Sequence, residues 1–165
     1  MGRFRALTAA VLGAASLFVG GASVASADED GVLLSFHSMA GVTQDQTSIA
    51  NDRGIVGGGK PWVITLGIGH LSSDGKLHVR VKGLVIPVAP FNGTNPVAQF
   101  GVTVSCLTPA IVNVRSTSLF DTGPAGNAVI DTTVDLPSNC MDPIVFVTSP
   151  GGAWFARSVP DDEEG

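Results

Sequence analysis

The chain has 165 residues, of which 44% are hydrophobic and only 14% are charged. This composition excludes an intrinsically disordered chain, which combines low hydrophobicity with high charge, and the length suits one domain. The formal net charge of −5 also argues against a nucleic-acid partner, because that binding depends on neutralising phosphates.

The first 27 residues have the order of a secretory signal peptide. Arg3 and Arg5 precede an uncharged apolar run over 6–24, and Ala25-Ser26-Ala27 then forms a cleavage site of small residues. The alternative is an uncleaved anchor, because a run of about 19 residues can just span a bilayer. Its Ala- and Gly-rich composition favours cleavage, which would remove both arginines and lower the net charge to −7. We therefore expect a secreted, extracellular protein with no membrane contact after cleavage.

An apolar run over 32–36 predicts the first strand, and an irregular segment over 38–60 follows it. Its Gly, Ser, Thr, Gln and Asn content predicts a long surface loop, and the sequence leaves its order open. The string GIVGGGK over 54–60 resembles a phosphate-binding loop. Such a loop continues with Ser or Thr and a helix, whereas Pro61 and a β-like run follow here. No nucleotide or other cofactor is expected.

Alternation with period two predicts a hairpin over 62–82. Trp62 starts an apolar face that continues through Ile64, Leu66 and Ile68, and Asp74-Gly75 predicts the tight turn. The return strand has two faces, an apolar one with Leu77, Val79 and Val81 and a polar one with His78, Arg80 and Lys82.

The register of this hairpin decides where the histidines point. A two-residue turn pairs Ser73 with Lys76, so that His70 faces Val79 and the two imidazoles lie on opposite faces. A slip by one residue would place His70 beside His78. It would also set the apolar residues of the first strand against Arg80 and Lys82, so we expect the register without the slip.

Short alternating runs continue to the end of the chain, at 100–106, 111–120, 128–136, 144–148 and 153–157. Turn-forming strings separate the later ones, including DTGPAGN and SPGG. About seven or eight short strands without helix periodicity predict an all-β fold, an antiparallel β-sandwich over 28–160. A small β-barrel is the alternative. Residues 161–165 predict a flexible acidic tail.

Two cysteines, Cys106 and Cys140, lie in the exported part. An isolated pair in an oxidising compartment predicts one disulfide. A reactive thiol is the alternative, but it would need a basic partner, and the neighbouring residues supply none.

Three histidines, His37, His70 and His78, suggest a metal site, but zinc requires three or four converging ligands. No serine-hydrolase or zinc-protease motif is present. Asp131 and Asp135 lie about 13 Å apart along one strand, too far for the usual glycosidase pair, and predict the solvent face of an edge strand. We therefore expect no catalytic, cofactor or metal-binding residues, although a triad assembled in space stays open.

Trp62 and Trp154 are the candidate ligand contacts. An exposed tryptophan beside a loop can stack on a sugar ring with its flat apolar face. The alternative is that both belong to the core, since Trp62 shares its face with Ile64 and Leu66.

Four strings resemble a family of small secreted proteins that is frequent in soil actinobacteria: GGGKPWVI, GHLSSDGKLHVRVKGLVI, VSC and PIVFVTSPGGAWFA. The likeness covers about residues 31–158. It implies export and a compact domain framed by the Cys106–Cys140 pair and the SPGG hairpin. The family has no assigned activity, so the resemblance carries no catalytic residues.

Three functions follow as hypotheses. The first is a non-catalytic domain that binds an extracellular ligand such as cell-wall polysaccharide. The second is a structural protein that self-associates or binds another surface protein, which an exposed apolar patch would favour. The third is a secreted hydrolase, which requires His37 or His70 beside a carboxylate and a serine.

Overall fold

The computed structural model describes residues 31–161, and the expected signal peptide and residues 162–165 lie outside them. Within these residues no helix is long and apolar enough to cross a membrane. One short 3-10 helix, η1 (Gln44–Gln46), accompanies ten strands. The strands are β1 (Val32–Phe36), β2 (Ser38–Gly41), β3 (Leu66–Ser72), β4 (Lys76–Lys82), β5 (Gln99–Thr108), β6 (Ala110–Arg115), β7 (Phe120–Asp121), β8 (Ala128–Thr133), β9 (Met141–Thr148) and β10 (Trp154–Val159).

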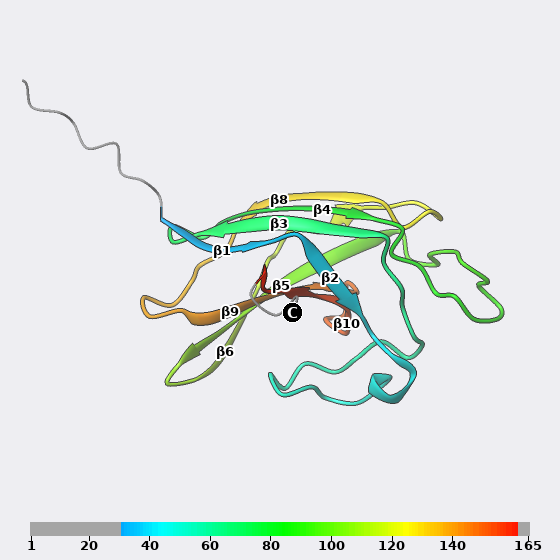
Figure 1. The fold of residues 1–165 in the computed structure, drawn as a ribbon, viewed down its shortest axis with the longest axis horizontal. Coiled ribbons are helices and arrows are strands. Elements are labelled where there is room, and N and C mark those ends of the chain that lie inside the picture. The colour runs from blue at the N-terminus through cyan, green and yellow to red at the C-terminus, as the bar shows by residue number, and fades with distance from the viewer. Residues whose placement is uncertain (1–30, 162–165) are drawn as a thin grey trace, which may run out of the picture.

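Two antiparallel sheets stack face to face (Figure 1). A four-stranded sheet has the order β1-β3-β4-β8, and a six-stranded sheet has the order β2-β10-β9-β5-β6 with β7 paired to β5. The sheets stay separate, so the predicted β-sandwich is confirmed and the closed-barrel alternative is wrong. The described residues hold more strands than expected, because the run at 111–120 divides into β6 and β7 and because β2 lies inside the expected loop.

The core lies between the sheets and follows from alternation. The inward residues of β4, Leu77, Val79 and Val81, are buried as predicted, while the alternate positions face solvent. Complete burial of one such side chain contributes about 1.5–3 kcal/mol. The opposing sheet adds a second set of fully buried residues: Phe100, Val102, Val104, Val145 and Val147.

The segment over 43–62, which we call the covering segment, is ordered and lies across the outer face of the six-stranded sheet (Figure 1). Backbone hydrogen bonds hold it to β10, with Gly58 N donating to Trp154 O at 2.9 Å and Trp154 N donating to Val56 O at 2.9 Å. Ile55 of this segment is buried. The segment expected over 38–60 is therefore irregular as predicted apart from β2 and η1, but it packs on the sheet, and β5 and β9 are buried on both faces.

The β3–β4 register differs from the prediction. His70 lies opposite His78 and Leu71 lies opposite Leu77. The loop has three residues rather than two, and Gly75 closes it with φ +85° and its N–H bonded to Ser72 O at 2.9 Å. A glycine in the left-handed region is typical of three-residue hairpin loops.

The reason for the slip is that the inward residues of β3 are Gly67, Gly69 and Leu71 rather than Leu66 and Ile68. Side chains from β1 and β2 fill the space above the two glycines. A Cβ on Gly67 would lie 2.3 Å from Met39 Cγ, and one on Gly69 would lie 2.8 Å from Phe36 Cζ. The apolar pattern of β3 therefore marks its outer face, because the core side over this strand is filled by its neighbours.

The predicted disulfide is present between Cys106 and Cys140, with Cα atoms 4.8 Å apart. Cys106 is fully buried at the end of β5, and Cys140 directly precedes β9. The bond therefore joins the ends of two central strands of the six-stranded sheet.

Arg53 holds the covering segment to the start of β9. It is only 5% exposed, its Nη2 forms an ion pair with the Asp142 carboxylate, and the same nitrogen donates to Asp142 O at 3.0 Å. Asn113 Nδ2 in turn donates to Arg53 O at 2.9 Å.

We expect Asp142→Asn to lower the free energy of unfolding by about 2 kcal/mol, because it leaves a buried guanidinium without its counter-charge. Asparagine tolerates the φ of +44° at this position, so the substitution changes only the charge. Arg53→Met should cost less than Asp142→Asn, because the carboxylate it leaves behind is 62% exposed. Urea unfolding of the three proteins measures both differences, and the reverse order would contradict this account.

Candidate functional site

Both predicted ligand contacts lie in the core. Trp62 is 4% exposed and stacks on Phe155 with ring centroids 4.0 Å apart, while Trp154 is 1% exposed and meets Phe146 edge-on at 6.0 Å. Neither indole presents a face on which a sugar could stack. The structure therefore supports the core alternative for both residues.

The observed register assembles a row of four polar side chains on the outer face of the four-stranded sheet. Ser35 lies opposite His70, His70 opposite His78, and His78 opposite Asp131, one residue from each strand. The imidazole centroids are 5.7 Å apart with 25° between the rings, and His78 Nδ1 contacts the Asp131 carboxylate. We call these four residues the polar row. No described element covers this face, which lies along the top of Figure 1.

Cations flank the polar row on the same face. Lys76, Arg80 and Lys82 alternate with the buried residues of β4. The side chains of Arg80 and Lys82 form no hydrogen bond or ion pair within residues 31–161. Lys76 pairs with Asp74 at 2.6 Å, and its side chain holds the pKa of that carboxyl below the usual value. Asp131 is the single acidic residue in the four strands of this sheet.

Two shallow depressions follow β4 along this face. One of about 560 Å³ includes His70, His78 and Asp131 among its lining residues. One of about 430 Å³ is lined by Arg80, Lys82 and Val129 together with the acidic Asp121 of β7. The seven residues of β4 extend the face over about 20 Å. The shape suits an extended ligand better than a compact one.

The polar row does not meet the geometric requirement for nucleophilic catalysis. A serine nucleophile and its base must lie within hydrogen-bond reach, and Ser35 and His70 share no hydrogen bond among the interactions of residues 31–161. Within the described residues, the one side-chain hydrogen bond of the row joins His78 to Asp131.

Metal-binding geometry is incomplete in the described residues. No group of three or more His, Cys, Asp or Glu side chains surrounds one point there. His37 lies elsewhere, with its Nδ1 3.0 Å from the carboxylate of Asp161, the first residue of the expected flexible tail. The argument that His70 and His78 point to opposite faces is wrong, because they are cross-strand neighbours.

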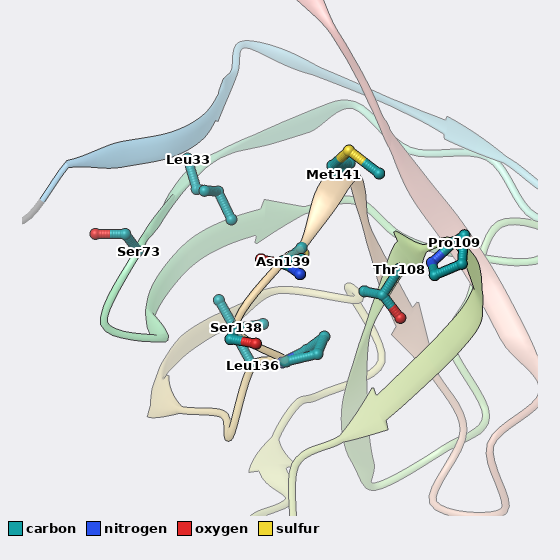
Figure 2. A pocket seen from close by; sticks show the side chains of 10 residues that line it. Leu33, Ser73, Thr108, Pro109, Leu136, Ser138, Asn139 and Met141 are labelled. Carbon is teal, nitrogen blue, oxygen red and sulfur yellow. The ribbon is translucent and has the colours of Figure 1, made fainter.

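A mainly apolar pocket of about 370 Å³ opens at one end of the sandwich beside the disulfide (Figure 2). Its walls come from β1, two turns and the loop before β9, and include Leu33, Pro109, Leu136 and Met141. No titratable side chain lines it, since Cys140 is held in the disulfide. It therefore has no acid or base with which to perform chemistry.

A smaller cleft of about 320 Å³ lies between the covering segment and β10. Asp45, Asn51, Asp52, Trp154 and Arg157 are among its lining residues. Trp154 Nε1 and Asn51 Nδ2 are buried without hydrogen-bond partners in the described part of the chain. Their burial leaves them out of reach of a ligand unless the covering segment moves.

The sequence patterns single out His70, His78 and Asp131 separately, do not bring them together, and give no signal for Ser35. The missed signal was the pair of glycines at 67 and 69, which marks the crowded inner face of β3. Comparisons with protein-family models, with characterised proteins and with solved structures found no match for this chain.

Proposed function

We propose that the mature chain is a secreted, non-catalytic domain that binds an acidic extracellular polysaccharide on the open face of the four-stranded sheet. The observation that carries this proposal is the pair of unpartnered cations, Arg80 and Lys82, on an uncovered face of an otherwise acidic protein. The leader-like N-terminus and the disulfide support export.

The chemistry of the face favours a sugar acid. A guanidinium binds a carboxylate or sulfate with two parallel hydrogen bonds, and such charge-assisted bonds contribute about 1.5–3 kcal/mol each. Aliphatic residues lie directly beside the cations, since Arg80 is opposite Ile68 and Val129, and Lys82 is opposite Leu66. These side chains suit the C–H faces of a sugar chain that lies along β4.

Nucleic acid fits this face less well. Its affinity grows with the number of phosphates neutralised, and the net negative charge of the whole chain opposes its approach. Bases of single-stranded nucleic acid stack on aromatic side chains. The described strands of this face offer only the two imidazoles for such stacking.

The test is retention of the mature protein on immobilised polygalacturonic acid and heparin, with neutral dextran and double-stranded DNA as comparison ligands. We expect retention on an acidic polysaccharide, and Arg80→Glu/Lys82→Glu should weaken it by more than tenfold, because two charge-assisted contacts become repulsive. Arg157→Glu is the matched control, since this arginine lies on β10 of the other sheet.

Three outcomes would overturn the proposal. They are unchanged retention of the double variant, equal loss for Arg157→Glu, and preference for DNA over both acidic polysaccharides. Sedimentation of the same samples tests the self-associating alternative, which predicts an oligomer whose formation the double variant does not affect.

A further inference from the structure

His70 and His78 have the placement of a cross-strand metal-binding pair. They lie directly opposite each other on adjacent antiparallel strands, on the same uncovered face, with ring centroids 5.7 Å apart. His70 has no side-chain hydrogen bond within residues 31–161, so its ring is available to turn toward its neighbour.

The contact with Asp131 prepares His78 for coordination. A carboxylate next to Nδ1 places the proton of the neutral imidazole on that nitrogen, which leaves Nε2 with the lone pair that a metal ion requires. Metal-binding histidines almost always donate their second ring N–H to a carboxylate or carbonyl in this way. The row therefore contains two imidazole ligands and one outer partner.

We infer that His70 and His78 form an open, exchangeable site for a divalent transition-metal ion of the zinc or copper type, with Asp131 orienting His78 and water completing the coordination. A tetrahedral ion with bonds of 2.0–2.1 Å brings the two Nε2 atoms to about 3.4 Å, so the stacked rings must rotate toward each other. Both residues lie on the face of the four-stranded sheet that no described element covers.

The neighbouring charges limit the affinity of this site. Lys76 and Arg80 flank His78 two positions away on β4 and oppose a cation, while Asp131 favours one. With two protein ligands and this charge balance, the site should exchange its ion readily rather than hold it as a structural metal. It does not depend on polysaccharide binding, since neither histidine ring is needed for the Arg80 and Lys82 contacts.

The experiment is calorimetric titration of the metal-free mature protein with ZnCl2 at pH 7.5 in a non-coordinating buffer, with NMR of the imidazole C–H signals. We expect one saturable site, with shifts of the His70 and His78 signals. His70→Ala and His78→Ala should abolish it, and Asp131→Asn should weaken it by roughly 10- to 100-fold, the usual effect of losing an outer partner.

His37→Ala is the matched control, because His37 is paired with Asp161 but has no second imidazole beside it. Unchanged binding by this variant supports the inference. Absence of saturation at millimolar zinc, or equal loss in all three histidine variants, would overturn it. Because the proteins carry no polysaccharide, failure here is distinct from failure of the proposed function.

Discussion

Replacing Trp154 with alanine is expected to lower the free energy of unfolding by about 3–5 kcal/mol, as for other buried aromatic residues. The side chain is 1% exposed and packs edge-on against Phe146, beneath the covering segment. Its loss should leave a cavity at the centre of the interface between that segment and the six-stranded sheet. Urea unfolding followed by far-UV circular dichroism gives the free energy directly.

Trp154→Phe separates packing from hydrogen bonding. The indole Nε1 has no partner in the described residues, so its removal forfeits no hydrogen bond, and we expect a cost of only about 1–2 kcal/mol from the smaller ring. Retention on acidic polysaccharide should be the same for this variant as for the natural protein. A loss of retention with unchanged stability would instead restore Trp154 as a ligand contact.

Alternation was sufficient to predict the sandwich and the orientation of β4. A strand with one apolar and one polar face must bury the first, and Leu77, Val79 and Val81 do so. The same reasoning predicts an edge strand that carries Asp131 and Asp135. This is right for Asp131, since β8 ends the four-stranded sheet, and wrong for Asp135, which lies beyond the end of β8 at Thr133. Local patterns predict these features because each depends on one strand alone.

The hairpin register could not be predicted in this way, because it depends on residues from other strands. Met39 and Phe36 take the space over β3 that Leu66 and Ile68 were expected to fill. This slip of one residue moves His70 to the side of His78, and it creates the polar row that the sequence argument had excluded.

The covering segment was missed for a related reason. The backbone bonds that hold it to β10 join Val56 and Gly58 to Trp154, about 100 positions later in the chain, and its composition resembles that of an open loop. The alternation predicts a strand that starts at Trp62, whereas β3 begins at Leu66 and Trp62 belongs to the covering segment. Long-range pairing by a polar, glycine-rich segment leaves no periodic signal in the sequence.

Removing the disulfide should have the second large effect on stability. The bond closes a loop with a sequence separation of 34, and loop-entropy arguments give about 3–4 kcal/mol for a loop of this length. Cys106→Ala/Cys140→Ala should therefore unfold at markedly lower urea concentration than the oxidised protein. Reduction of the natural protein should produce a similar shift, because it removes the same covalent constraint.

The disulfide lies where the backbone hydrogen bonds between β5 and β9 are interrupted. The β5–β9 pairing has an irregularity between Ser105 and Leu107, at the position of Cys106 itself. The covalent bond therefore fixes the strand ends where the regular ladder is interrupted.

The polar row and its flanking cations lie on the other sheet. The double cysteine variant, while still folded, should therefore retain acidic polysaccharide as the natural protein does. Loss of retention before any loss of folded structure would show that the two sheets are coupled more tightly than their separate hydrogen-bond networks imply.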